Sequence, residues 1–201
     1  MTNRGCYNEL VNTKNKIRCS WANTHELFIP YHDHEWGIPV HDDRDLFEIL
    51  NLESAQAGLS WLTVLKKRDN YRKAFDNFNA SKIARYNKIK QNALMKNEGI
   101  IRNHLKINAV IENAKAFLLI QREFGSFDGY IWKFVKNKTI PHTKRKDAVL
   151  ISEKVSKELK KRGFRFVGPT ICFAFMQAVG MVNDHTADCF RLKKTANTRT
   201  T

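Results

Sequence analysis

ELKKRGFRFVGPTICFAF, residues 158–175, has the pattern of a helix, a tight apolar hairpin and a second helix. Gly163 can take the left-handed conformation that ends the first helix, and Pro169 suits the first position of the second. Gly168 has no side chain to cover the free backbone amides where the second helix begins, and such amides can bind a phosphate. The stretch therefore predicts a helical hairpin, which is either a structural turn with a basic rim or a contact for DNA.

Basic residues are in excess along the whole chain. The 201 residues include 35 Lys and Arg against 20 Asp and Glu, a net charge of +15. Because basic groups displace condensed counterions from phosphate, this balance favours a nucleic acid partner over a chain that is merely rich in lysine. The residues around the hairpin that are expected to contact DNA are Lys160, Lys161, Arg162, Arg165, Gly168 and Thr170.

Nothing in the sequence indicates a membrane protein or an exported one. No apolar run approaches the roughly 18 residues of a membrane span, and the first residues lack the apolar core of a signal peptide. A cytoplasmic protein is therefore expected. Residues 1–18 are predicted to form a flexible leader, 19–192 a single helical domain of two closely packed lobes, and 193–201 a basic tail.

Hydrophobic periodicity indicates helices and no strands, so the predicted fold class is all-α. The clearest pattern lies in 104–124, where apolar residues recur at i, i+3, i+4 and i+7. Ser126 and Ser152 are expected to cap two later helices, and 137–149 is expected to be a loop. The other predicted helices cover residues 42–58, 60–75 (as two pieces), 152–163 and 169–180.

Histidines and cysteines at both ends of the chain can form a metal site. His185 and Cys189 are four residues apart, so on a helix they would share one face. Two more ligands are needed, and Cys19 with either His32 or His34 can supply them. An extended backbone would point these two histidines to opposite sides, so only one is expected to bind. A Cys2His2 set is typical of a closed, structural zinc site, with unrelated buried cysteines and surface histidines as the alternative.

The assembled features resemble one family, the type I 3-methyladenine DNA glycosylases of the helix-hairpin-helix superfamily. The matching stretches run in order over roughly residues 19–190. They are YHDHEWG (31–37), LFEILNLESAQAGLSWLTVLKKRDNYRKAF (46–75), GIIRNHLKI (99–107), LKKRGFRFVGPTICFAFMQAVGMVNDH (159–185) and the final His-x3-Cys. The resemblance implies a helix-hairpin-helix glycosylase fold with a zinc site that joins the N- and C-terminal segments.

The resemblance also implies an activity and a partner. Members of the family flip a damaged adenine out of double-stranded alkylated DNA and hydrolyse its N-glycosidic bond, which leaves an abasic site. The expected protein is therefore a DNA repair enzyme, a monomer without an obligate protein partner, associated with the nucleoid in the cytoplasm of a bacterium.

One structural zinc ion is implied by the same resemblance. The positions that match the family's ligands are Cys19, His32, His185 and Cys189. His34 then becomes a residue of the surface or of the second layer around the metal. The two remaining cysteines, Cys6 and Cys172, are read as non-ligands.

The resemblance assigns a base pocket as well. Glu53 matches the catalytic carboxylate that binds the edge of the base, and Trp61 matches the ring that stacks on it. Tyr31 matches a tyrosine whose hydroxyl reaches the base, and Trp21 is expected near the same pocket. Phe28 stands where the family often has tyrosine, so stacking is retained there and a hydroxyl is lost.

A second departure concerns acid–base chemistry. Many helix-hairpin-helix glycosylases carry an aspartate shortly after the hairpin, and the segment MVNDH places Asn183 at that position, with Asp184 one step later. An asparagine cannot act as a general base, so weak acid–base assistance is expected. The chain also lacks a lysine placed as in bifunctional lyases, which predicts a monofunctional enzyme.

Two other readings compete with this one. A non-catalytic, zinc-containing binder of damaged DNA would share the charge and the hairpin, and only turnover would separate it from an enzyme. A zinc hydrolase that uses the HDH segment would need an open coordination position, which four protein ligands do not leave.

Overall fold

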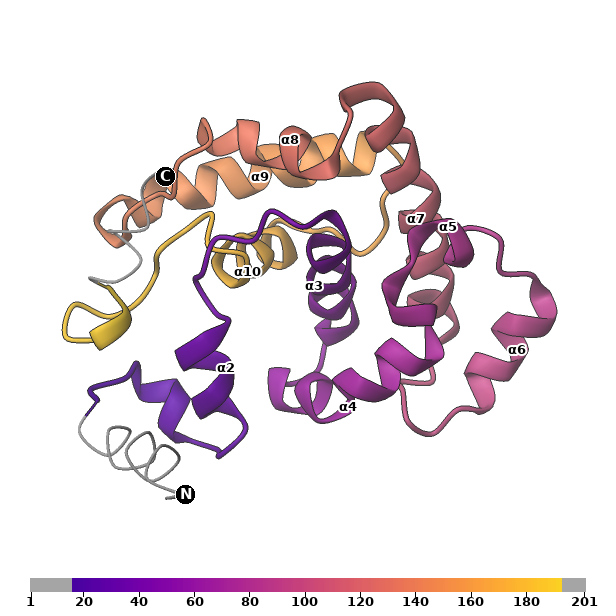
Figure 1. The fold of residues 1–201 in the computed structure, drawn as a ribbon, viewed down its shortest axis with the longest axis horizontal. Coiled ribbons are helices and arrows are strands. Elements are labelled where there is room, and N and C mark those ends of the chain that lie inside the picture. Colours follow the sequence, from indigo (N-terminus) through magenta and orange to yellow (C-terminus); the bar gives the residue numbers. More distant parts are fainter. Residues whose placement is uncertain (1–15, 193–201) are drawn as a thin grey trace, which may run out of the picture.

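The computed structural model describes residues 16–192, and within this range the chain is built from helices joined by short turns (Figure 1). Among these residues the extended pairing is limited to an isolated parallel bridge between Ile140 and Val182. The prediction of an all-α fold is therefore confirmed for the described part of the chain. With 3-10 helices marked η, the elements are η1 (Ser20–Asn23), α2 (Phe28–His34), α3 (Asp43–Gln56), α4 (Trp61–Ala74), η2 (Asp76–Phe78), α5 (Ala80–Ile83), α6 (Lys88–Lys96), α7 (His104–Phe124), α8 (Phe127–Ile131), η3 (Trp132–Val135), η4 (His142–Lys144), α9 (Arg145–Lys161) and α10 (Pro169–Ala178).

Part of what the sequence predicts lies outside the described residues. This holds for Cys6, for the basic tail at 193–201 and for residues 1–15 of the predicted leader. At the end of that leader, the Arg18 side chain is largely buried and pairs with the Asp33 carboxylate at 2.7 Å.

Helix α3 lies in the middle of the fold, where α4, α7, α8 and α10 pack against it (Figure 1). Leu46 and Phe47 on its inner face are fully buried. Asp42 is its N-cap, since the Asp42 carboxylate accepts a hydrogen bond from the backbone amide three residues later at 3.0 Å. The helix predicted over 42–58 is thus confirmed, and it places its buried face at the centre of the molecule.

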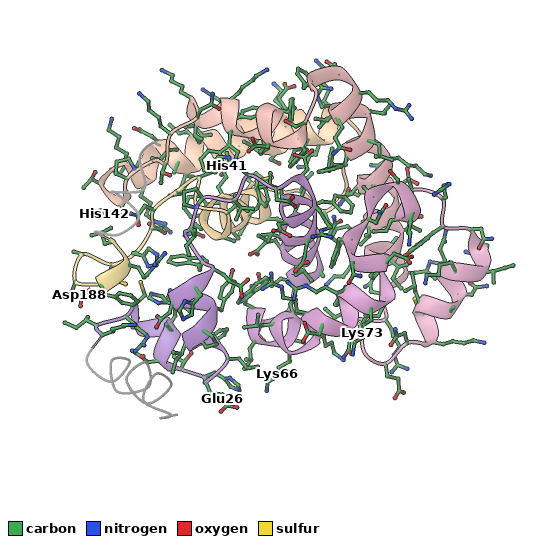
Figure 2. All side chains as sticks on the ribbon, in the orientation of Figure 1. Glu26, His41, Lys66, Lys73, His142 and Asp188 are labelled. Carbon is green, nitrogen blue, oxygen red and sulfur yellow. The ribbon has the colours of Figure 1, made fainter. Side chains whose placement is uncertain are left out.

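The sequence pattern predicts helix α7 correctly and helix α4 only in part. Helix α7 covers the same residues, 104–124, that the periodicity predicts. Helix α4 is one continuous helix rather than the two pieces predicted over 60–75, because no glycine or proline interrupts it. Its outer face is exposed and carries Lys66 and Lys73 (Figure 2).

Helix α9 begins well before the residue that the sequence pattern predicts. It starts at Arg145, so the loop predicted over 137–149 is wrong for its last residues. Ser152 is not an N-cap, because it is buried inside the helix and its hydroxyl donates to the Val149 carbonyl at 2.7 Å. The apolar face starts at Ala148, which is fully buried although the residues just before it are charged.

Ser126 caps α8, as predicted, and a turn joins α9 to α10 where the hairpin is predicted. Gly163 closes the first helix at a φ of +94°, a value that favours glycine. Gly168 is the N-cap of α10, and Pro169 is its first residue. Between these points Phe164 turns into the core and is 1% exposed.

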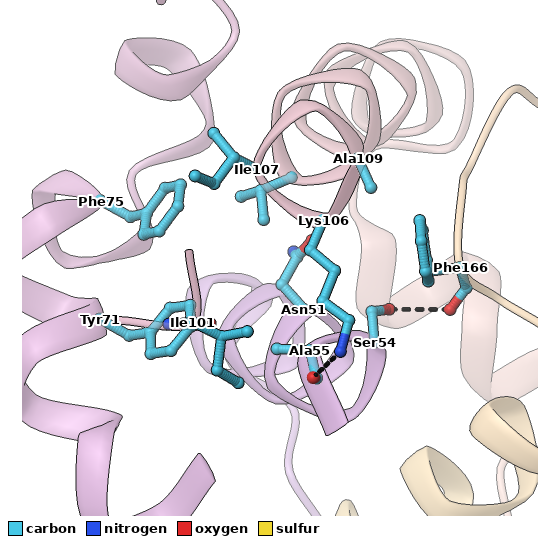
Figure 3. Close-up of a pocket in the computed structure, with 11 residues that line it drawn as sticks. Asn51, Ser54, Ala55, Tyr71, Phe75, Ile101, Lys106, Ile107, Ala109 and Phe166 are labelled. Carbon is cyan, nitrogen blue, oxygen red and sulfur yellow. Dashed lines mark hydrogen bonds between the residues drawn. The ribbon is translucent and has the colours of Figure 1, made fainter. Parts of the chain in front are cut away.

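Buried polar side chains bind the backbone of this turn. The Arg165 amide donates to Asn113 Oδ1 on α7 at 2.7 Å, and Asn113 Nδ2 donates to Asn51 Oδ1 on α3 at 3.0 Å. Ser54, also on α3, donates its hydroxyl to the Phe166 carbonyl at 2.9 Å (Figure 3). Phe166 has a φ of +53°, which is unfavourable for a side chain of this size, so these contacts hold a strained residue.

The two ends of the described chain lie side by side (Figure 1). The backbone amide of Phe190 donates to the carbonyl of Ile17 at 2.9 Å, although the two residues are at opposite ends of the sequence. None of the described helices combines the length and the hydrophobicity that crossing a membrane requires.

We expect the substitution Asn113→Ala to lower the free energy of unfolding by about 1–3 kcal/mol, because it removes a buried side chain that hydrogen-bonds to both the amide and the carbonyl of Arg165 in the turn. Lys115→Ala, on the exposed side of the same helix, is the matched control and should change stability by less than about 0.5 kcal/mol. Urea denaturation followed by circular dichroism measures both. Equal stability of the two variants would show that the Asn113 network does not hold the turn.

Candidate active site and metal centre

A pocket of about 280 Å³ lies where η1, α2, α3, α4 and α10 meet. This volume approaches the lower end of the range for small-molecule sites. The pocket is mostly aromatic, with a few polar groups. Its lining residues are Trp21, Phe28, Tyr31, Trp36, Glu53, Gln56, Trp61, Ala174 and Gln177.

The aromatic rings of the pocket support one another. Tyr31 and Trp61, which lie on different helices, have ring centroids 5.4 Å apart. Trp21 meets Phe28 edge to face at 5.7 Å and Trp36 edge to face at 5.1 Å. These separations are typical of favourable ring pairs, so the walls are held in place and offer several π faces to a ligand.

Glu53 is the acidic group of this pocket. Its side chain comes from α3, it is 4% exposed, and its carboxyl group forms no hydrogen bond with another described residue. Burial raises the pKa of Glu53 to about 8, because the charged form is poorly solvated there. Near neutral pH Glu53 is therefore a mostly protonated carboxylic acid, and a cationic ligand would favour its ionised form.

Tyr31 shares this environment. Its ring is buried, and burial together with the nearby Glu53 raises the pKa of the Tyr31 hydroxyl well above its ordinary value. The hydroxyl group therefore stays protonated and can donate a hydrogen bond.

Lys106, on α7, fixes the end of α3 next to the pocket. Its ammonium group donates to the Ala55 carbonyl at 2.7 Å (Figure 3). It also donates to the Ala57 carbonyl at 2.7 Å. A cation at this place satisfies carbonyls that a helix C-terminus leaves unpaired. The turn that follows leads directly to Trp61, so Lys106 helps to set the position of Trp61 relative to Glu53. The cavity drawn in Figure 3 is only about 10 Å³, room for about one water molecule rather than for a base.

Four buried side chains form a cluster that could hold a metal ion. The donor atoms of Cys19, His32, His185 and Cys189 all lie within 4.8 Å of one another. Cys189 Sγ is 3.4 Å from His32 Nε2 and 3.5 Å from His185 Nδ1, and Cys19 Sγ is 3.6 Å from His185 Nδ1. Sulfur and nitrogen ligands of a tetrahedral zinc ion lie about 3.5 Å apart, so the donor set fits this ion.

Neighbouring groups orient these donors. Asp33 Oδ1 lies 2.9 Å from His32 Nδ1, which leaves Nε2 facing the cluster. The Thr186 amide donates to Cys19 Sγ at 3.4 Å. Such outer contacts are typical of metal ligands, because they set the histidine tautomer and stabilise thiolate charge.

Burial also controls the protonation of the donors. It lowers the pKa of His185 to about 4 and lowers the pKa of His32, so both rings are neutral at pH 7 and keep a lone pair. It raises the pKa of the Cys19 thiol, which a metal ion would have to deprotonate on binding. Gly37 makes room for this cluster, since a Cβ atom there would lie 2.8 Å from His185 Nε2.

The structure thus brings together the four cysteine and histidine residues proposed as ligands, but two local premises are wrong. His32 and His34 lie on helix α2 and not on an extended segment. Two helical residues are about 200° apart around the axis, so they still point to different sides, and His34 is exposed. His185 and Cys189 are joined by a turn rather than by a helix, and this turn brings their donor atoms together. Cys172 lies outside the cluster.

Both polar atoms of the Asn183 side-chain amide form hydrogen bonds with the backbone. Asn183 Nδ2 donates to the Leu192 carbonyl at 3.1 Å, and Asn183 Oδ1 accepts from the His185 amide at 3.4 Å. It therefore shapes the turn that carries His185 and Cys189.

The five aromatic and acidic residues proposed for the base pocket, namely Trp21, Phe28, Tyr31, Glu53 and Trp61, all line it. Four further residues line the pocket without having been predicted from the sequence, namely Trp36, Gln56, Ala174 and Gln177. All four stand in stretches that resemble the family, so the motifs offered a signal, although nothing in the residue pattern assigned these positions to the pocket.

The basic residues of the hairpin region differ in their surroundings. Lys160, Lys161 and Arg165 are exposed. Arg162 forms an ion pair with Glu123 at 2.7 Å, and its guanidinium also lies over the rings of Phe124 and Tyr130, 4.8 and 4.9 Å from their centroids. Arg162 is therefore engaged within the protein, and the exposed cations are the ones available to a phosphate.

Comparison with known proteins places this geometry in a family. The chain is 45% identical over 181 residues to the DNA-3-methyladenine glycosylase of Haemophilus influenzae, which covers 86% of this chain and 96% of that protein. It is also 45% identical over 177 residues to DNA-3-methyladenine glycosylase 1 of Escherichia coli, with 86% of this chain and 95% of that protein covered.

A solved structure agrees with these relatives. The structure of 3-methyladenine DNA glycosylase I from Staphylococcus aureus, which concerns the recognition of 3-methyladenine by that enzyme, superposes with a TM-score of 0.81 at 35% identity. The match covers 87% of this chain and 96% of that one. The model of the methyladenine glycosylase family matches residues 21–192. This chain therefore belongs to the methyladenine glycosylase family.

Proposed function

We propose that this protein is a DNA repair enzyme that flips 3-methyladenine out of alkylated double-stranded DNA and hydrolyses its N-glycosidic bond. The observation that carries the proposal is the unpaired, buried carboxyl group of Glu53 in the lining of an aromatic pocket. Family membership and the names of the relatives support the same substrate.

The substrate suits the pocket because of its charge. Methylation at N3 gives the adenine of DNA a positive charge, which an aromatic face stabilises by about 0.5–2 kcal/mol. The same charge lowers the pKa of Glu53, so the carboxyl group ionises and pairs with the base. Neutral adenine gives neither contribution, and flipping is least costly at a damaged pair. Most of the rate of base excision then comes from selective binding of the base and from its weak bond to the sugar.

The reaction needs little acid–base help from the protein. When the C1′–N9 bond breaks, its electron pair neutralises the charge of the leaving base. Water adds its hydroxyl group to C1′ and releases a proton, which leaves an abasic site. Asn183 cannot accept that proton, and we propose a monofunctional enzyme with no covalent intermediate on the protein.

We propose further that the Cys19, His32, His185 and Cys189 cluster holds one structural zinc ion. The distances between its sulfur and nitrogen donors support this metal, and four protein ligands leave no open position for catalysis. Bound zinc would join the first and last described segments, and thereby keep Trp21 and Tyr31 at the pocket.

The third part of the proposal is the DNA contact. In a helix-hairpin-helix arrangement, the turn from α9 to α10 would face a phosphate with the free amides at Gly168 and Thr170, aided by Lys160, Lys161 and Arg165. We propose that residues 19–192 act as one domain of two packed lobes and as a monomer, in the cytoplasm and at the nucleoid of a bacterium.

We expect Glu53→Gln to reduce the release of 3-methyladenine from methylated duplex DNA by at least about 100-fold, because the pocket loses its negative charge. Chromatography of the released bases is the measurement. Glu26→Gln, which changes an exposed acid, should release base at the wild-type rate. If the wild-type protein binds this DNA without releasing base, the protein is a damage binder and not an enzyme.

The stability of the same variant shows whether lost activity reflects unfolding. The pKa of Glu53 is about 8 in the folded protein against an ordinary value of 4.5, so folded molecules keep a proton that unfolded ones release between these pH values. Its contribution to stability is therefore complete below pH 4.5 and is lost as pH rises towards 8. The melting temperature of Glu53→Gln should exceed that of the wild type by a margin that grows from pH 5 to pH 8.

For the metal, we expect Cys19→Ser and His32→Ala each to lower the zinc content and the melting temperature together, because a structural zinc site stabilises the fold through its ligands. His34→Ala is the matched control, since His34 is the neighbouring exposed histidine and should keep its zinc. Elemental analysis and thermal melting measure both quantities. Zinc retained by His32→Ala and lost from His34→Ala would contradict the ligand assignment.

For the DNA contact, Gly168→Asp should bind undamaged duplex DNA roughly tenfold more weakly at low salt, because its carboxylate repels phosphate and covers the amides. A Cβ atom at Gly168 meets nothing within 4 Å, so the fold tolerates the change. Gly168→Asn introduces a side chain of the same shape without the charge, so it should weaken DNA binding less than Gly168→Asp does. Fluorescence anisotropy over a salt series is the test, and unchanged affinity in all salts would exclude this contact.

A further inference from the structure

Gln177 is a polar residue of the base pocket whose amide orientation is settled by its neighbour. It lies on α10 and lines the pocket, while its Nε2 donates to Asp184 Oδ2 at 2.5 Å. A carboxylate only accepts hydrogen bonds, so the NH2 end of the Gln177 amide has to face Asp184. Asp184 itself does not line the pocket.

Asp184 is held from a second direction. The Arg145 guanidinium lies 2.5 Å from the same oxygen, Asp184 Oδ2, and packs over the ring of Phe173 at 4.8 Å from its centroid. The Asp184 side chain is 16% exposed, whereas the Arg145 side chain is 54% exposed, so Asp184 is the shielded partner of the pair. With its carboxylate held in this way, Asp184 cannot easily turn away and release the Gln177 amide.

The carbonyl oxygen of Gln177 is the polar atom that remains for a ligand. Within residues 16–192, Gln177 Oε1 has no hydrogen-bond partner, so the Gln177 side chain offers an acceptor at a fixed orientation. Purine bases differ in the group on C6, which can be a hydrogen-bond donor or an acceptor. Adenine has an amino donor at C6, whereas guanine and hypoxanthine have an oxygen there, and an oxygen cannot donate to an acceptor.

We propose that Gln177 is a specificity-determining residue, which accepts a hydrogen bond from the C6 amino group of the bound base, and that Asp184 is its positioning residue. The proposal rests on the proposed function, because it assigns a task within the same pocket. A 6-oxo purine would place oxygen against oxygen and leave both acceptors without a donor, which is a basis for rejection.

The other polar groups of the pocket discriminate less well at C6. Gln56 has no side-chain hydrogen bond to a described residue, so its amide can turn to present either a donor or an acceptor. The carboxyl group of Glu53 can accept when ionised and donate when protonated. Of these three side chains, only Gln177 has a hydrogen bond that fixes its orientation. It is therefore the side chain that can distinguish an amino group from an oxygen at C6.

The test uses two free bases that differ at C6, 3-methyladenine and 3-methylhypoxanthine. Quenching of the pocket tryptophans measures the dissociation constant of each base, and the readout is the ratio of the two constants. We expect wild-type protein to prefer 3-methyladenine, and Gln177→Leu to lower this preference roughly tenfold, mainly through weaker binding of 3-methyladenine. Asp184→Asn should lower it roughly threefold, because an asparagine side chain can either accept or donate and so lets the Gln177 amide turn.

Glu123→Gln is the matched control, because it also removes a carboxylate from an arginine ion pair, at a distance from the pocket residues. Its preference should equal that of the wild type, and zinc content should be unchanged in all three variants. If Gln177→Leu keeps the wild-type ratio, or if wild-type protein binds both bases equally, this inference is wrong and the proposed function stands. If wild-type protein binds neither base nor releases 3-methyladenine from DNA, the proposed function fails as well.

Discussion

The buried contact between the α9–α10 turn and helix α3 is the constraint on which the rest of the structure depends. The turn carries partly buried backbone groups, and Ser54 and the Asn51–Asn113 pair bind them. Unpaired buried backbone groups are costly, so this docking has one stable geometry. The same helix presents Glu53 to the pocket. The candidate phosphate contact and the candidate base pocket are therefore held at a fixed separation by one rigid element.

The molecule contains two buried polar centres, and they differ in how they are satisfied. The cluster of Cys19, His32, His185 and Cys189 has donors close enough together to hold one metal ion. Glu53 is different, because no described group pairs with its carboxyl and burial raises its pKa to about 8. A stable protein rarely keeps such a group without a use, since perturbed pKa values gather at functional sites. The first centre suits a structural role, and the second suits a ligand that brings its own positive charge.

The helices that the sequence predicts well are those whose signals are local. Helix α7 repeats its apolar positions over its whole length, and α10 has glycine and proline at its start. Predictions were wrong where a local signal was misleading. The basic residues around Ala148 hid the first turn of α9, and the alternation in the HDH segment indicated an extended backbone where α2 is helical. In both places tertiary packing outweighed the local pattern.

The sequence by itself determined the residue types of the candidate site, because aromatic rings, a carboxylate, histidines and cysteines stand in motifs that can be recognised. It also determined most helices, since caps and periodicity act over a few residues. The tertiary structure alone decided which distant groups meet. Lys106 contacts the end of α3, about fifty residues away in sequence. Arg145 contacts Asp184, about forty residues away. Contacts of this kind leave no spacing in the chain, because they depend on how whole helices pack and not on the residues beside them.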